Sequence, residues 1–507
     1  MNSMTKKGRG FKLSVLILML SMVLSACGGG GSKTADAGDT GKAAGETPKE
    51  STSDKKSTEL VLYFAGDPQK DTELVEQKVN EYLQPKLNAT VKINFVPWSD
   101  YKTKLPVLIA SGRKIDVMFT NPDTYSSLAA KGALTPVNDL LDQFGADAKE
   151  AMYSKFLDIS MVNGKNYAVQ NPKEIASQWV LRFNKPLADK LGIDTTQADS
   201  IEKVGDLLKQ AKAKDGGLYP MEATQTGIFY VPFDYVAGQD VPLGMIYGPG
   251  ADSGKIVDMW ETPEASKALD VVHSYYKAGY IRPDVVTYKM PTSEEQTGNW
   301  LTGLAGGIPT ADNIWTSRAG FPVTYVPIEK PIVTTSSGTG SMLAIPVTAQ
   351  DKELSMKFIN LLHSDVYLHN LFVYGIEDVH YKKIGDNRVE DLPARKERFN
   401  TAWFEFGNGF LTYLTKDDPE DKWEQFKKFN DEAETSPLVG FNFDVSKVQS
   451  EIAAVKNVSA EISIPLKSGA VDPAVYLPKA ISKFKEAGLD KIMTEMQSQY
   501  DAWKATK

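Results

Sequence analysis

The order of strands and helices in the first part of the chain restricts its fold more than any other feature. Residues 59–65 form an apolar run closed by glycine and proline, which predicts a buried strand. A helical pattern follows over 71–87, a second strand over 91–95, a helix over 99–110 and a third strand over 116–119. A β-α-β-α-β order places parallel strands in one sheet with helices on its faces. We therefore predict an α/β fold whose ligands lie beyond the carboxyl ends of the strands.

The rest of the chain also mixes strands and helices. A turn at 163–165 predicts a hairpin between 159–162 and 167–169. The helix over 263–278 has the clearest ends, with Thr262 as its N-cap. Further strands are expected at 178–183, 304–309, 342–347 and 441–443. Further helices are expected at 186–191, 200–214, 478–487, 490–504 and 348–363, the last beginning with Thr348 and Asp351 at capping-box spacing.

The N-terminus has the features of an export signal. Four basic residues and no acidic one precede a twelve-residue run, 13–24, that is apolar apart from two serines. This run is too short to span a membrane, which takes about 20 apolar residues. It ends in Leu24-Ser25-Ala26-Cys27, and Cys27 is the only cysteine in the chain. The segment resembles the lipobox of bacterial lipoproteins, which implies cleavage before Cys27 and diacylglycerol on its thiol. The alternative is a plain secretory signal with an incidental cysteine.

Composition narrows the function classes. Residues 28–57 contain almost nothing apolar, so they cannot form a core and are expected to be a flexible tether. Loss of four basic charges with the signal peptide moves the net charge from −8 to −12. An acidic body argues against nucleic acid as a partner and against membrane binding by charge. A single cysteine excludes a disulfide framework, so the fold must depend on its core.

Five stretches resemble a known family. They are 162–169 (Val-Asn-Gly-Lys-Asn-Tyr-Ala-Val), 361–365 (Leu-Leu-His-Ser-Asp), 371–381 (Leu-Phe-Val-Tyr-Gly-Ile-Glu-Asp-Val-His-Tyr), 436–441 (Ser-Pro-Leu-Val-Gly-Phe) and 497–503 (Gln-Ser-Gln-Tyr-Asp-Ala-Trp). Together they resemble extracellular solute-binding protein family 1, the lipoprotein receptors of ABC-type sugar importers. The last two resemble the C-terminal module of one lipoprotein subfamily. Asp378 departs from the family pattern, in which glycine is expected after the glutamate.

The resemblance implies a two-lobed, periplasmic-binding-protein-like (type II) fold with an interlobe cleft and a small C-terminal α+β module. It also implies ABC permease subunits and a cytoplasmic ATPase as partners, a monomeric receptor, and a lipid anchor on the outer face of the cytoplasmic membrane. The expected boundaries are a signal peptide over residues 1–26 and a lipidated tether over 27–57. The first lobe is expected to comprise 58–170 and, after a return of the chain, 304–347. The second lobe is expected to comprise 171–303 and, after a second return, 348–436, and the C-terminal module 437–507.

Candidate ligand-binding residues follow from the chemistry of a sugar. Its hydroxyl edges and apolar C–H faces need aromatic rings together with carboxylates, amides or guanidinium groups. The chain places such mixtures at predicted strand ends, and Trp315 is the preferred stacking residue because it follows a small-residue strand within a polar segment. The candidates are Asp67, Asn121, Asp123, Tyr125, Trp179, Arg182, Tyr230, Asp234, Trp300, Asp312, Trp315, Arg318, Glu377, Asp378 and Trp403, which is followed by Glu405.

Each candidate also has a structural interpretation. Every tryptophan could pack in the core, and Arg182 could form a salt bridge within its lobe. Glu377 and Asp378 could bind ligand, act as general acid and base, or lie in a solvated turn. Adjacent carboxylates in an extended segment point to opposite sides, which suits glycoside hydrolysis poorly. The sequence has no GxSxG elbow, P-loop, GxGxxG or two-histidine zinc motif, so we expect no catalytic residue, metal or cofactor.

Two functions from different classes fit these features. The first is a receptor that captures a carbohydrate, expected to be an oligosaccharide, and delivers it intact to an ABC importer. The second is a lipid-anchored extracellular hydrolase that cleaves glycans. A binding protein for a peptide or another polar solute is a further possibility within the first class.

Overall fold

The computed structural model describes residues 57–506 apart from 163, 225–226, 249–250 and 252–253. The predicted signal peptide and Cys27 lie outside the described residues. Nearly all of the predicted tether does as well.

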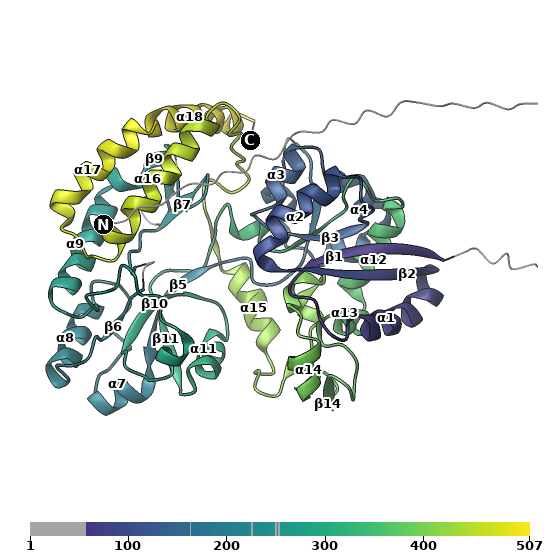
Figure 1. Ribbon diagram of the computed structural model, residues 1–507, viewed down its shortest axis with the longest axis horizontal. Helices are drawn as coiled ribbons and strands as arrows, with labels where there is room; N and C mark the ends of the chain where they lie inside the picture. Colours follow the sequence, from purple (N-terminus) through teal and green to yellow (C-terminus); the bar gives the residue numbers. More distant parts are fainter. Residues whose placement is uncertain (1–56, 163, 225–226, 249–250, 252–253, 507) are drawn as a thin grey trace, which may run out of the picture. The chain divides into compact units, whose positions relative to one another are not determined.

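The first sheet has five strands in the order β2-β1-β3-β13-β4 (Figure 1). β1 is parallel to both β2 and β3, whereas β13 is antiparallel to β3 and β4. The predicted β-α-β-α-β unit is therefore confirmed, with two antiparallel strands added at one edge. Its elements are β1 (Thr58–Ala65), α1 (Thr72–Leu87), β2 (Ala89–Val96), α2 (Trp98–Ala110), β3 (Val117–Thr120), β4 (Ala168–Gln170) and β13 (Met342–Ala344).

Helices from late in the chain complete the core of this first lobe. Phe372 of α13 (Val366–Val373) lies 6.0 Å, between ring centroids, from Phe64 of β1 and 5.9 Å from Phe358 of α12 (Lys352–Ser364). The same core continues to Tyr413. We expected 348–436 to return to the second lobe, but most of this segment belongs to the first. The reason is that α13 buries its apolar face against β1 and α12 packs on α13 in the same core.

The second sheet has the order β11-β5-β10-β6 and is antiparallel except for the β10–β6 pair. Side chains of β5 alternate between two cores, with Val180 on the side of α11 and Leu181 and Phe183 on the side of α8. We expected residues 304–347 to return to the first lobe. Because β10 and β11 pair with β5 in the second sheet, β13 is the strand of this segment that lies in the first lobe. The elements are β5 (Gln178–Asn184), α7 (Lys185–Leu191), α8 (Val204–Lys214), β6 (Met221–Glu222), α9 (Pro263–Lys277), β10 (Thr302–Gly307), α11 (Ala311–Ala319) and β11 (Val323–Pro327).

Two predicted β features are wrong. Among the described residues of 159–169, the two expected strands do not pair: α6 (Phe156–Ile159) precedes a single Val162–Lys165 bridge, and β4 pairs with β13 instead. Ala168 and Val169 are fully buried, so they gain more from a place inside the sheet than from a local turn. Residues 441–443 form no strand, and Phe441 packs on Tyr500 and Trp503.

The C-terminal module is built from α16 (Gln449–Lys467), α17 (Pro473–Glu486) and α18 (Leu489–Lys504). They share one core with α9 and with the three-stranded sheet β7 (Phe233–Tyr235), β8 (Leu243–Ile246) and β9 (Val257–Asp258). The sequence predicted α17 and α18 but not α16. Pro465 inside α16 and its many β-branched residues weaken the helical signal.

Shorter elements complete the chain, and some of them, such as α3, α4 and α5, pack into the core of the first lobe. They are α3 (Tyr125–Ala130), α4 (Asn138–Phe144), α5 (Ala146–Ala151), α10 (Thr292–Glu295), β12 (Ile332–Val333), β14 (Tyr381–Gly385), β15 (Arg388–Asp391), α14 (Pro393–Arg398), β16 (Leu414–Thr415), α15 (Lys422–Asp431), β17 (Glu434–Thr435) and the 3-10 helices Met259–Glu261, Ser337–Thr339, Trp403–Glu405 and Gly409–Leu411. Among the described residues, no helix combines the length and apolar character needed to cross a membrane.

Candidate functional site

An aromatic platform lies at the carboxyl edge of the first sheet. Trp98 follows β2 directly and is 46% exposed. Its ring centroid lies 5.8 Å from that of Phe119 on β3 and 6.2 Å from that of Phe404. We name Trp98 and Phe404 the first-lobe platform. An exposed indole supported by two further rings suits the apolar face of a sugar. Trp98 was not among the residues predicted from the sequence, although it follows a predicted strand end as Asp67 and Asn121 do.

Polar side chains hold this edge in place. The main-chain oxygen of Phe404 accepts hydrogen bonds from Asn171 Nδ2 at 3.0 Å and Ser341 Oγ at 2.5 Å. Asn121 Oδ1 accepts from the main-chain N–H of Asp123 at 3.1 Å, which orders the loop after β3. Parallel strands end at the same edge, so Asp67, Asn121 and Asp123 lie on the side of the sheet where Trp98 lies. Three predicted residues thus share one edge with the platform.

Glu405 is a buried carboxyl group at this edge. Its Oε2 accepts from the main-chain N–H of Ala65, the last residue of β1, at 2.9 Å. Among the described residues, no hydrogen-bond partner faces its Oε1. Burial raises the pKa of Glu405 well above its ordinary value, which favours the neutral acid. A neutral carboxyl can donate as well as accept a hydrogen bond.

A second polar-aromatic group centres on Glu329, which follows β11. Tyr247 Oη donates to Glu329 Oε2 at 3.0 Å, and Tyr230 Oη donates to the same oxygen. The main-chain N–H of Trp179 donates to Glu329 Oε1 at 2.8 Å, and the Trp179 and Tyr230 ring centroids are 6.2 Å apart. Burial raises the pKa of Glu329 although three donors stabilise its anion. Trp179 and Tyr230 were predicted and lie together, whereas Glu329 and Tyr247 carried no sequence signal.

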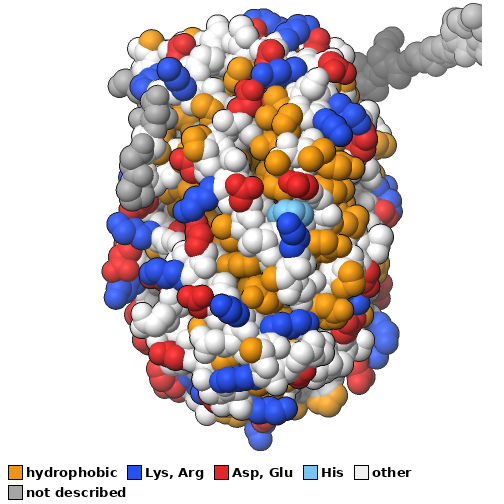
Figure 2. Space-filling model, turned by 90° about the vertical axis from the view of Figure 1, so that its left-hand side faces the viewer, with side chains coloured by type: hydrophobic (Ala, Val, Ile, Leu, Met, Phe, Trp, Pro, Cys, Tyr) orange, Lys and Arg blue, Asp and Glu red, His pale blue; other side chains and the backbone are white. Residues whose placement is uncertain are grey.

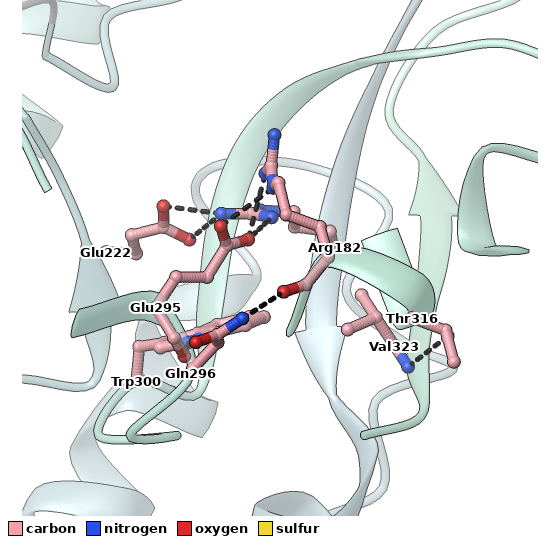
Figure 3. Close-up of polar contacts among 8 residues, drawn as sticks. Arg182, Glu222, Glu295, Gln296, Trp300, Thr316 and Val323 are labelled. Atoms are coloured by element: carbon pink, nitrogen blue, oxygen red, sulfur yellow. Dashed lines mark hydrogen bonds and ion pairs between the residues drawn. The ribbon is translucent and has the colours of Figure 1, made fainter. Parts of the chain in front are cut away.

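Arg182 is the centre of a buried charge network (Figure 3). Its guanidinium is 5% exposed and donates to Glu295 and Glu222 at 2.5 Å each. Arg318 Nε donates to Glu295 at 2.7 Å, so two positive charges face two negative ones. The guanidinium carbon of Arg182 also lies 4.8 Å from the centroid of Trp300. Of the two interpretations of Arg182, the structure shows the salt bridge within its lobe.

The two carboxyls of this network differ in their electrostatics. Burial raises the pKa of Glu222, and the Arg182 charge offsets only part of that effect. Burial also acts on Glu295, but hydrogen bonds from Arg318 and Arg182 outweigh it and lower the pKa of Glu295. The difference follows from the number of arginines, because Glu295 has two and Glu222 one.

Several predicted residues lie in the core instead of on a binding surface. Trp315 is 7% exposed and packs edge-on against Tyr325, with ring centroids 5.8 Å apart. The indole of Trp300 is buried and donates from Nε1 to the main-chain oxygen of Glu295 at 3.1 Å. The choice of Trp315 as stacking residue fails because α11 turns its apolar face, with this ring, towards the sheet.

Tyr125 and Asp234 are buried as well. Tyr125 Oη donates to the main-chain oxygen of Ser160 at 2.5 Å, and burial raises the pKa of Tyr125 to about 12. Asp234 accepts from the main-chain N–H and the hydroxyl of Thr335 at 3.0 and 2.8 Å. Burial raises the pKa of Asp234. Both residues therefore tie segments of the chain together.

The remaining predicted residues lie at or near the surface. Glu377 and Asp378 are exposed, and Asp378 has a positive φ of 61° in a turn. Asp312 is half-buried in the first turn of α11, and Trp403 packs against Trp423 with ring centroids 5.6 Å apart. Within the described ranges, no three acidic, histidine or cysteine side chains are placed to hold a metal ion.

Surface charge is locally balanced on the face drawn in Figure 2, where basic and acidic side chains alternate between hydrophobic patches. Exposed charges of opposite sign also form ion pairs in the described part of the chain. Lys267 pairs with Glu202 at 2.7 Å, and Lys483 pairs with Glu461 at 2.6 Å. A face of this kind offers no broad field of one sign for a polyanion.

Comparison with known sequences assigns most of the chain. The profile described as "Bacterial extracellular solute-binding protein" matches residues 66–367, more than half of the chain. A second profile, described as "Domain of unknown function (DUF3502)", matches residues 437–505. The chain is also 29% identical over 501 residues to a carbohydrate ABC transporter substrate-binding protein of Streptococcus pneumoniae serotype 4, covering 97% of this chain and 98% of that protein. The resemblance of the last part of the chain to a C-terminal module is thus confirmed. The α+β character expected for that module is not seen, because the described residues after 436 form helices and no strand.

Solved structures agree with this assignment. The crystal structure of the N-glycan transport solute binding protein NgtS from S. pneumoniae matches with a TM-score of 0.82 and 29% identity, covering 89% of this chain and 100% of that one. An extracellular solute-binding protein from Bifidobacterium longum subsp. infantis shares the fold, with a TM-score of 0.60 and 15% identity over 89% of this chain and 99% of that one. The chain therefore belongs to the bacterial extracellular solute-binding protein family and has its two-lobed type II fold.

Proposed function

We propose that this chain is a receptor that captures a neutral oligosaccharide outside the cell and delivers it intact to an ABC importer. The relative that matches along almost its full length is a carbohydrate substrate-binding protein, and NgtS was crystallised with Man1GlcNAc and with Man5GlcNAc. The observation that carries the proposal is the exposed Trp98 ring at the carboxyl edge of the first sheet. The polar side chains of Asn121 and Asp123 beside it suit sugar hydroxyls.

The mechanism we propose is closure of the two lobes on the ligand. The second lobe would contribute the half-buried Trp179 and Tyr230, so a sugar that contacts both lobes favours the closed form by that extra affinity. NgtS supports such a change. Its structure without a named ligand gives a TM-score of 0.82, whereas its Man1GlcNAc and Man5GlcNAc complexes give 0.71 and 0.69. Scores that fall in the complexes are what a change of conformation on glycan binding would produce.

Attachment to the membrane is part of the proposal. Diacylglycerol on Cys27 would anchor the receptor on the outer face of the cytoplasmic membrane, and the tether over 28–57 would let its monomeric body reach the permease subunits. Mass spectrometry of the mature N-terminus tests this: we expect a lipidated cysteine as first residue. A Cys27→Ala variant that stays in the membrane fraction would contradict the anchor.

We also propose that the glycan leaves unchanged. Glu377 and Asp378 are both exposed, and Asp378 lies in a turn, whereas glycosidases hold their two carboxyl groups on either side of the scissile bond. Incubation with Man5GlcNAc followed by mass spectrometry should return the intact glycan. Shorter products in stoichiometric excess over the protein would establish a hydrolase instead. A thermal-shift panel with peptides and other polar solutes tests the remaining alternative.

Calorimetric titration of Man5GlcNAc into the Trp98→Ala variant tests the site directly. Loss of a stacking ring typically costs about 1–3 kcal/mol, so we expect Kd to rise by about ten- to hundredfold. The matched control is Tyr476→Ala, because Tyr476 on α17 is 43% exposed against 46% for Trp98. Tyr476→Ala should leave Kd unchanged. Equal affinities of wild type and Trp98→Ala would remove the platform from the site.

A further inference from the structure

A separate pocket with a volume of about 340 Å³ opens in the second lobe. All of its lining residues lie between 215 and 300, in β6, the turn before it and the segment around α10. Small-molecule sites have volumes of roughly 300–1,000 Å³, so this pocket has room for a monosaccharide-sized ligand but not for a long chain. Because the first-lobe platform contributes none of these walls, the pocket is complete within one lobe.

One ring in this pocket is available for stacking. Tyr219 is 43% exposed, with Lys212 Nζ 4.9 Å from its centroid. The Tyr288 ring is only half-exposed, and the Arg282 guanidinium packs closely on it, 3.4 Å from its centroid. Trp300 is buried and forms part of the floor. Tyr219 is therefore the platform of the pocket.

The polar walls favour a neutral ligand. Asp215, Glu222 and Glu294 place three carboxyl groups around the pocket, and Arg282 is its one lining guanidinium. Arg282 already pairs with Asp284 at 2.5 Å and with Glu294 at 2.8 Å. An anionic ligand would meet excess negative charge, whereas hydroxyl groups can donate to these acceptors.

Glu222 is fixed in orientation by the charge network of Figure 3. Arg182 binds both of its oxygens at 2.5 Å, and Arg182 is itself held by Glu295. A Cβ at Gly303 would lie 2.7 Å from Glu222 Oε2, so this glycine makes room for the carboxyl group. Each carboxylate oxygen has two acceptor sites, which leaves capacity for a ligand hydroxyl. A preorganised acceptor at the base of a cavity is a feature of built polar sites.

We propose that this pocket binds a neutral hexose unit at a second site, separate from the first-lobe platform. Tyr219 stacks on the sugar, and Glu222 and Asn299 hydrogen-bond its hydroxyls. The choice of a sugar rests on the proposed function, whereas the existence of the site rests on the pocket itself. Because every wall belongs to one lobe, binding here needs no lobe closure and is independent of Trp98.

Calorimetry with the neutral disaccharide Man1GlcNAc tests this proposal on the full mature chain. We expect wild type to bind two equivalents. Tyr219→Ala should weaken one of them by about tenfold or more and leave the other unchanged. Trp98→Ala should weaken the other equivalent and leave the Tyr219-dependent one unchanged. The control Tyr476→Ala, at the same 43% exposure as Tyr219, should keep both. Asn299→Ala, a change at an exposed position, serves as a second pocket variant that does not endanger folding.

The outcomes separate the two proposals. A single equivalent that depends on Trp98 and not on Tyr219 would refute the pocket and leave the proposed function intact. A single equivalent that depends on Tyr219 and not on Trp98 would refute the first-lobe platform and support the pocket. Two equivalents that both survive Tyr219→Ala and Asn299→Ala would overturn the pocket as well.

Discussion

Replacing Arg182 by methionine is the sharpest test of the second-lobe charge network. Methionine fills much of the space of the arginine stem and removes only the charge and its hydrogen bonds. Arg182 is 5% exposed, and its side-chain partners Glu222 and Glu295 are 12% and 6% exposed. The substitution therefore leaves two buried carboxyls, of which Glu295 keeps Arg318 and Glu222 keeps none.

The expected loss of stability is large. Breaking a buried ion pair by removal of one partner costs about 3–5 kcal/mol, because the remaining charge is buried and uncompensated. For Arg182→Met we expect about 3 kcal/mol or more at pH 8 in the free energy of unfolding of the second lobe. Arg318→Met is the matched control: Arg318 is 46% exposed and leaves Glu295 with Arg182, so it should cost about 0–1 kcal/mol.

The loss should depend on pH in a defined direction. Burial already raises the folded-state pKa of Glu222 above 4.5, and removal of Arg182 takes away the charge that lowers it. A carboxyl whose pKa is raised by folding binds its proton more tightly in the folded chain, so stability falls as pH rises from the ordinary pKa to the folded one. The difference between Arg182→Met and wild type should thus be small near pH 4 and complete at pH 8.

Urea unfolding at pH 4 and pH 8, followed by tryptophan fluorescence, measures both the loss of stability in Arg182→Met and its dependence on pH. The double variant Arg182→Met/Glu222→Gln should recover part of the loss at pH 8, since it removes the uncompensated carboxylate. Two results would refute the reasoning: an Arg182→Met variant within about 1 kcal/mol of wild type at pH 8, or an equal loss in Arg318→Met.

Two local predictions concern backbone geometry. Asp351, and not Thr348, accepts from the Leu354 N–H at 2.9 Å as N-cap of α12, so Asp351→Ala should cost about 0.5–2 kcal/mol in thermal unfolding and Thr348→Ala much less. Asp378 has a φ of 61°, a left-handed conformation that glycine adopts freely. Asp378→Gly should therefore leave the thermal stability unchanged or raise it by up to about 1 kcal/mol. A clear loss of stability would show that the Asp378 side chain contributes to the turn.

The first lobe was largely predictable, whereas the assignment of later segments to lobes was not. Strands and helices between 59 and 119 follow local periodicity, and their right-handed crossovers leave few arrangements. By contrast, β10 joins the second sheet because Thr302 pairs with Phe183, far away in the sequence. Phe372 reaches the first lobe by contact with Phe64. Neither contact can be read from local periodicity. An apolar strand or helix face has the same sequence pattern whichever lobe buries it, so the pattern does not reveal its partner.

The difference between local and long-range pairing also explains which residues of the candidate site could be predicted. In the first lobe, parallel strands bring their carboxyl ends to one edge, so residues that follow strands in the sequence, such as Asn121 and Trp98, lie along the same edge. The second sheet is mostly antiparallel, and its strand ends alternate between opposite edges. Polar residues there meet through side chains that cross between loops, as Tyr230 does with Glu329 at a separation of 99 residues. Position relative to a strand end therefore predicts which residues gather at the platform edge of the first lobe. In the second lobe it selects buried residues such as Trp315 as readily as exposed ones.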